Sequence, residues 1–96
     1  MLQHVYARSP RMVSRRIAGE CVLVPLAARG ADLDSIYNLN PVAAFIWERL
    51  DGRTPGETIV GALTESFEVD SDTATRDFTA FVETLQSLGA LEPVAR

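Results

Sequence analysis

The chain has little cysteine and little histidine: Cys21 and His4 are the only residues of either type. A single cysteine excludes an internal disulfide, and one cysteine with one histidine cannot supply the ligands of a structural zinc site. Cys21 lies in an apolar run with no histidine near it in the sequence, and a thiol in such a run is usually a small buried hydrophobe. The sequence therefore predicts no metal and no cofactor bound by this chain.

Long apolar runs and glycine-rich loops are also missing. The longest apolar stretch, residues 21–28, is far shorter than the roughly 20 residues that a membrane-spanning helix needs, and Pro25 interrupts it. The N-terminal arginines have no apolar segment beside them, so no secretory signal is expected. The glycines are isolated and match no nucleotide-binding fingerprint. We therefore expect a cytoplasmic protein without a membrane segment.

What the chain does have is the composition of one globular domain. Of its 96 residues, 47% are hydrophobic and 23% are charged, which is enough apolar surface for a packed core and a length suited to a single one. We expect a flexible N-terminal segment over residues 1–10 and one domain over residues 11–96.

The charge is distributed unevenly along the chain. Residues 1–29 carry five arginines against Glu20, a net charge of +4, whereas residues 30–96 carry four arginines against twelve acids, a net charge of −8. An acidic surface repels phosphate backbones and favours partners with basic segments, although many domains are acidic for solubility alone.

The first half of the chain has the pattern of β-strands. Residues 12–18 and 20–26 are two strand-like runs joined at Gly19, which can adopt the positive φ of a tight hairpin turn. A looser connection leads to a third run, residues 33–39, with alternating side chains. These runs predict an antiparallel three-stranded meander.

The second half has helical spacing. Asn40-Pro41 has the pattern of an N-cap followed by proline at the first helical position, and Gly52 is placed to end that helix. A capping box at Thr54 predicts a second helix over residues 55–66. A third helix is expected to begin at Asp70 or Ser71 and to end at Gly89. The fold class predicted is α+β, a winged helix-turn-helix-like arrangement of a three-stranded antiparallel sheet followed by three helices.

No cluster of side chains points to catalysis. A positioned base, nucleophile or metal is usually needed, and Asp70, Asp72 and Asp77 are explained by the favourable interaction of acids with a helix N-terminus. We expect no enzymatic activity.

The helix that would enter a DNA groove is acidic. Residues 70–88 contain Asp70, Asp72, Asp77 and Glu83 against Arg76 alone, whereas groove-binding helices rely on arginine and lysine to neutralise phosphates. The N-terminal arginines lack interleaved aromatic residues that would stack on bases. We therefore expect no nucleic-acid partner.

Three blocks of sequence resemble the PqqD-like family. Residues 35–52, which read Ser-Ile-Tyr-Asn-Leu-Asn-Pro-Val-Ala-Ala-Phe-Ile-Trp-Glu-Arg-Leu-Asp-Gly, are similar to the family's central signature of Leu-Asn, Ile-Trp and Asp-Gly. Residues 54–59 resemble its Thr-x-x-Glu-x-Ile segment. Its final pattern is matched by Asp77, Phe81, Leu85, Gly89 and Leu91. The resemblance covers about residues 13–92.

The resemblance implies a recognition element for ribosomally synthesised precursor peptides. Members of the family bind the leader part of the precursor and present it to a modifying enzyme, often a radical S-adenosylmethionine protein, to which the iron–sulfur chemistry would belong. The leader adds as a strand to the third strand of the meander and packs against the last helix. An edge strand is suited to this role because its N–H and C=O groups are free to pair.

The resemblance also implies which residues bind the peptide. Those on the third strand are Asp34, Ser35, Ile36, Tyr37 and Asn38. Those on or beside the polar face of the last helix are Arg76, Thr79, Ala80 and Glu83.

Other interpretations stay open at this point. Members that serve pyrroloquinoline quinone synthesis have a Pro-Glu-Gly-like segment where this chain has residues 34–37, so the chain resembles the broader family and its product is not defined. Alternative functions are a winged-helix nucleic-acid binder, or a structural subunit of an enzyme complex that uses the same edge to form a homodimer.

Overall fold

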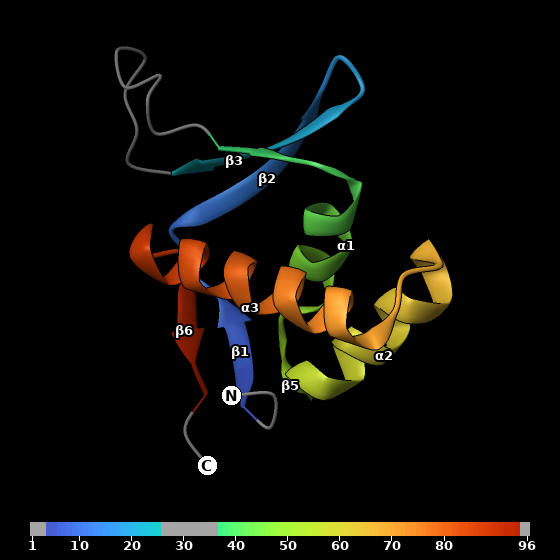
Figure 1. Ribbon diagram of the computed structural model, residues 1–96. Coiled ribbons are helices and arrows are strands. Elements are labelled where there is room, and N and C mark those ends of the chain that lie inside the picture. The colour runs from blue at the N-terminus through green and yellow to red at the C-terminus, as the bar shows by residue number, and fades with distance from the viewer. Residues whose placement is uncertain (1–3, 26–36, 95–96) are drawn as a thin grey trace.

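The chain forms two small sheets that share one core with three helices (Figure 1). The computed structural model describes residues 4–25 and 37–94. In chain order the elements are β1 (Val5–Arg8), β2 (Met12–Ile17), β3 (Glu20–Pro25), β4 (Tyr37–Leu39), α1 (Pro41–Arg49), β5 (Asp51–Pro55), α2 (Gly56–Phe67), α3 (Ser71–Ser87) and β6 (Leu91–Pro93). The α+β class and its winged arrangement are confirmed.

The predicted meander is present as the antiparallel sheet β2-β3-β4. Its hairpin turn is two residues long, because Ile17 pairs with Glu20. Ala18 has φ 53° and Gly19 has φ 83°, and two consecutive positive φ values give the turn a twist that matches the flanking strands. The beginning of the predicted third strand, residues 33–36, lies outside the described residues.

Helix α1 begins as the sequence predicts. The side chain of Asn40 accepts a hydrogen bond from the Ala43 N–H at 2.8 Å, and Pro41 occupies the first turn. The helix ends at Arg49, earlier than predicted, and Gly52 does not terminate it. Gly52 adopts φ 81° inside β5, where a Cβ atom would lie 3.5 Å from the Cβ of Ala7.

The predicted capping box of α2 is wrong. Thr54 lies in β5, and its N–H and hydroxyl donate to the carboxylate of Asp51 at 2.9 and 3.1 Å. The helix begins at Gly56, with Pro55 as an N-cap that makes no side-chain hydrogen bond. The Asp51 carboxylate therefore engages the threonine that the sequence pattern assigns to the helix.

Helix α3 follows its prediction closely. The carboxylate of Asp70 accepts a hydrogen bond from the Thr73 N–H at 2.7 Å. The helix ends at Ser87, and Gly89 follows with φ 71° in the left-handed region.

The prediction of a flexible segment over residues 1–10 is wrong where the structure describes it. Strand β1 is the central strand of a second sheet, ordered β5-β1-β6, and Val5 and Tyr6 are only 3% and 4% exposed. The strand is held from both sides by short strands distant in sequence, so no local pattern indicated its pairing. The domain therefore includes β1.

The core lies between the two sheets. Helix α1 runs down from the β2-β3-β4 sheet towards α2 and β5, and α3 crosses in front of β1 (Figure 1). The largest fully buried side chains come from β3, from the three helices and from the residue that follows α1. They are Phe78, Leu23, Ile46, Leu50, Ile59, Leu63, Leu85 and Val82. Among the described residues, no helix is long and apolar enough to cross a membrane.

Candidate functional site

Strand β4 forms an edge of its sheet. It pairs with β3 on one side, and over the described residues no strand pairs with its other side. Its side chains alternate, with Leu39 buried, Tyr37 half-buried and Asn38 exposed. The free side of β4 therefore offers backbone N–H and C=O groups to another chain.

A groove of about 280 Å³ opens beside this strand, between α1 and α3. Its lining residues are Tyr37, Asn40, Val42, Ala43, Ile46, Asp77, Ala80, Phe81 and Thr84. Tyr37 is the first described residue of β4, so the groove reaches that end of the strand. We call this the β4–α3 groove.

The floor of the β4–α3 groove is apolar and its rim carries few polar groups. Phe81 and Ile46 are buried, whereas Asp77 is exposed at the rim. The Thr84 hydroxyl already donates to the carbonyl of Ala80 at 3.0 Å. The groove can therefore bury apolar side chains of a bound segment, and the Asp77 carboxylate can attract a basic group.

The structure brings together only part of the predicted site. Tyr37 and Ala80 line the β4–α3 groove from opposite walls. Asn38 lines a different cavity. The remaining helical positions are outside the lining: Arg76, Thr79 and Glu83. Asp34, Ser35 and Ile36 lie outside the described residues.

On α3, the predicted positions and the groove lining differ by a rotation of the helix face by one residue. The lining positions are Asp77, Ala80, Phe81 and Thr84, spaced as one face of an α-helix, whereas the predicted set begins one residue earlier. Asp77 and Phe81 belong to the family pattern present in the sequence, so that pattern held the signal for the face that lines the groove. The contribution of α1 to the groove was also missed, because its apolar spacing was assigned to the core alone.

A larger cavity of about 600 Å³ lies on the other side of α1. It is bounded by the β2–β3 hairpin, the first turns of α1 and the end of α2, and Cys21, Leu39, Phe45 and Phe67 contribute apolar surface. Arg16, Glu20 and Glu48 line it as well, so its charge is mixed. Asn40 borders both cavities, which places the β4–α1 junction between them.

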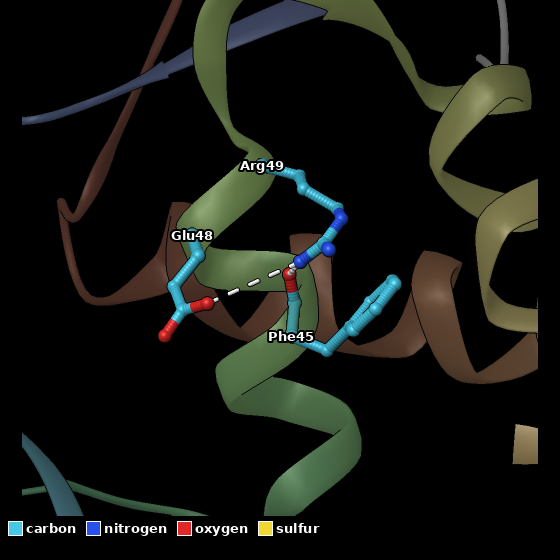
Figure 2. A network of polar contacts seen from close by, with 3 residues as sticks. All are labelled: Phe45, Glu48 and Arg49. Atoms are coloured by element: carbon cyan, nitrogen blue, oxygen red, sulfur yellow. Dashed lines mark hydrogen bonds and ion pairs between the residues drawn. The ribbon is translucent and has the colours of Figure 1, made fainter. Parts of the chain in front are cut away.

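Phe45 and Glu48, which both line this cavity, lie close to Arg49 near the end of α1 (Figure 2). The Arg49 guanidinium stacks over the Phe45 ring at 3.4 Å and donates to the Phe45 carbonyl at 3.1 Å. Glu48 adds a long ion pair to Arg49 at 4.0 Å. The Phe45 ring also meets Phe67 edge-to-face, with 5.3 Å between ring centroids. These contacts join α1 to the end of α2.

The perturbed carboxylates are structural. The Arg53 N–H, followed by the Thr54 donors, holds the pKa of Asp51 below its usual value. The Thr73 N–H does the same for the pKa of Asp70. Neither residue lines the β4–α3 groove. Within residues 4–25 and 37–94, no three His, Cys, Asp or Glu side chains gather as a metal site.

An α+β domain with an open sheet edge beside an apolar groove has the architecture of a binding module. The chain belongs to the PqqD family: the family model described as coenzyme PQQ synthesis protein D (PqqD) matches residues 20–91, well over half of the chain.

Two solved structures are similar over nearly the whole chain. A lasso peptide synthetase B1 complexed with the leader peptide is 26% identical, with a TM-score of 0.74, and the match covers 92% of this chain and 98% of that one. TbiB1 in complex with the TbiA(beta) leader peptide is 30% identical, with a TM-score of 0.73, and the match covers 94% and 99%. No curated protein shows significant sequence similarity.

Proposed function

We propose that this protein binds the leader of a ribosomally synthesised precursor peptide and presents it to a modifying enzyme. The observation that carries the proposal is the β4–α3 groove beside an open strand edge. Two similar structures, at 26% and 30% identity, were solved with leader peptides.

In this proposal the leader extends the sheet at β4. Backbone groups of residues 34–38 pair with the leader. The proposed binding strand of this protein therefore includes Asp34, Ser35 and Ile36. Apolar leader side chains enter the β4–α3 groove between Tyr37, Phe81 and Ala80. Backbone pairing supplies affinity for any extended segment, so the groove must supply the selectivity.

The protein acts as a recognition element rather than as a catalyst. Among the residues that the structure describes, the only carboxylate lining the β4–α3 groove is Asp77, and neither His4 nor Cys21 lines it. The chemical step belongs to the partner enzyme, which in this family is often a radical S-adenosylmethionine protein. A homodimer formed through β4 would compete with the leader for the same edge.

The nucleic-acid alternative gains no support from the fold. The exposed positions of α3 include Asp72, Asp77 and Glu83 with Arg76. Such a surface repels the phosphates that a groove-binding helix must neutralise.

The proposal is tested by titrating labelled protein with leader peptides encoded near its gene. Amide signals of residues 37–40 and 77–84 should shift. Ala80→Arg places a charged side chain in the groove from an exposed position, so the variant should fold and its affinity should fall by about tenfold or more. Gln86→Arg is the matched control, because it adds the same charge at an exposed position of α3 that does not line the groove, and it should bind normally.

Two results would sink the proposal. One is the failure of every neighbouring leader to bind the wild-type protein. The other is an equal loss of affinity in the Ala80→Arg and Gln86→Arg variants, since that would place the peptide away from the groove.

A further inference from the structure

The β2-β3-β4 sheet has a second edge, which the leader does not use. Strand β2 pairs with β3 on one side, and within the described residues no strand pairs with the other. After Met12 and Val13 the residues of the strand are exposed from Ser14 to Ile17, and Ile17 retains 56% of its accessible surface. Because β3 separates β2 from β4, a chain at the β2 edge would leave the β4–α3 groove free.

The β2 edge is basic. Arg15 and Arg16 are consecutive exposed residues of the strand, and the exposed Arg11 precedes it. Over residues 4–25 and 37–94, none of these three arginines has an ion-pair partner, since the ion pair of that part of the chain joins Arg49 to Glu48. Every basic side chain except the histidine is an arginine, whose planar guanidinium binds a carboxylate through two parallel hydrogen bonds.

The register places the two arginines on opposite faces of the sheet. Arg16 lies opposite Cys21, which lies opposite Leu39, so it belongs to the face that covers α1. Arg15 lies opposite Val22, on the other face of the sheet. A strand added to β2 would therefore meet one guanidinium above the sheet and one below it. Two adjacent acidic residues in the added strand would satisfy both, because successive side chains alternate between faces.

We propose that the β2 edge docks an extended acidic segment of a protein partner, with two adjacent carboxylates opposite Arg15 and Arg16 and an apolar residue opposite Ile17. Under the proposed function this partner is the modifying enzyme. Leader and enzyme would then occupy opposite edges of one sheet and bind at the same time.

Charge argues against the other occupants of this edge. Two copies of β2 paired antiparallel would bring the two arginine pairs close together, and like charges across strands are destabilising. The acidic surface of α3 would repel the same segment, so an acidic strand is directed to β2 and away from the leader groove.

A capped peptide with a central Val-Glu-Glu sequence is the probe. Titrated into labelled full-length protein, it should shift the amide signals of residues 12–17 and leave those of 77–84 unchanged. The same peptide with Val-Lys-Lys should not bind. The double variant Arg15→Glu with Arg16→Glu should bind the acidic probe at least about tenfold more weakly, since it replaces two attractions with two repulsions.

Two controls separate docking from a general charge effect or a folding defect. Arg53→Glu makes a charge change of the same sign at an exposed site in β5 and should bind the probe normally. Arg15→Lys with Arg16→Lys keeps the charge and should recover most of the binding lost in the glutamate variant.

The inference is overturned if both probes bind alike, if the acidic probe shifts β4 or α3 instead of β2, or if the reversed variant binds as well as wild type. Displacement of the acidic probe by a short oligonucleotide would also overturn it, because the edge would then be a phosphate site. Leader binding is measured on the same samples. If the leader binds and the acidic probe does not, only this inference fails. If no leader binds the wild-type protein, the proposed function fails.

Discussion

Single side chains cap the starts of α1 and α3. Asp70 is the N-cap of α3 and accepts the Thr73 N–H through a carboxylate oxygen at 2.7 Å. That hydrogen bond stabilises the charged form, so the pKa of Asp70 lies below its usual value of 3.8. A group whose pKa is lowered by folding stabilises the protein above its unfolded pKa, and that contribution is lost as pH falls through the folded value.

Asp70→Asn should therefore make stability less sensitive to acid. Asparagine keeps an oxygen to accept the Thr73 N–H, but it carries no proton that titrates in this range. Urea unfolding midpoints should fall less between pH 6 and pH 3 for the variant than for wild type. Asp72→Asn, which removes a first-turn carboxylate without removing the cap, should leave the steeper dependence largely in place. Parallel curves for wild type and Asp70→Asn would contradict the prediction.

The elements show which parts of a sequence can be interpreted locally. The meander, α1 and α3 were predicted because Gly19, Asn40 and Asp70 act within their own turns. The capping-box pattern at Thr54 is equally local, yet the Thr54 hydroxyl donates to the Asp51 carboxylate instead of capping the helix. Neither the pairing of β1 nor the lining of the groove is local, since each depends on elements that are distant in the sequence.

The β2–β3 hairpin gives a test at the scale of one element. Ala18 adopts φ 53°, a left-handed conformation that costs an alanine about 1 kcal/mol or more. Asparagine tolerates this conformation and is favoured before glycine in such turns, so Ala18→Asn should raise the free energy of unfolding by about 0.5 kcal/mol.

Gly19→Ala is the opposite test in the same turn. Gly19 adopts φ 83°, and a Cβ there would meet no atom within 4 Å, so the cost is conformational strain without a clash. The free energy of unfolding should fall by about 1 kcal/mol. Chemical denaturation of both variants checks the pair, and equal effects of the same sign would contradict the assigned turn.

At the scale of the whole molecule, the N-terminal strand belongs to the fold. Tyr6 is 4% exposed and packs in the common core, and β1 lies between β5 and β6. The His4 carbonyl accepts the Gly56 N–H at 3.1 Å, and the Val5 carbonyl accepts the Val94 N–H at 3.1 Å. The family match that begins at residue 20 therefore omits a strand on which this structure depends.

Tyr6→Ala should lower the free energy of unfolding by about 3 kcal/mol, because it leaves a cavity beneath a central strand. Leu88→Ala removes a side chain that is 46% exposed and should cost no more than about 0.5 kcal/mol. Urea denaturation measures both. Similar small losses for the two variants would mean that β1 contributes little to the folded state.

The pairing of β1 with β6 also has a consequence for how the protein is made. Strand β1 is made before the other described strands, yet one of its partners, β6, includes almost the last residues described, with Tyr6 opposite Pro93. The β2–β3 hairpin can close as soon as it emerges, whereas β1 can pair with β5 only after residues 51–55 have been made, and with β6 only after residues 91–93. The β5-β1-β6 sheet is therefore completed long after the hairpin, and β1 has neither partner while the hairpin, β4 and α1 are being made.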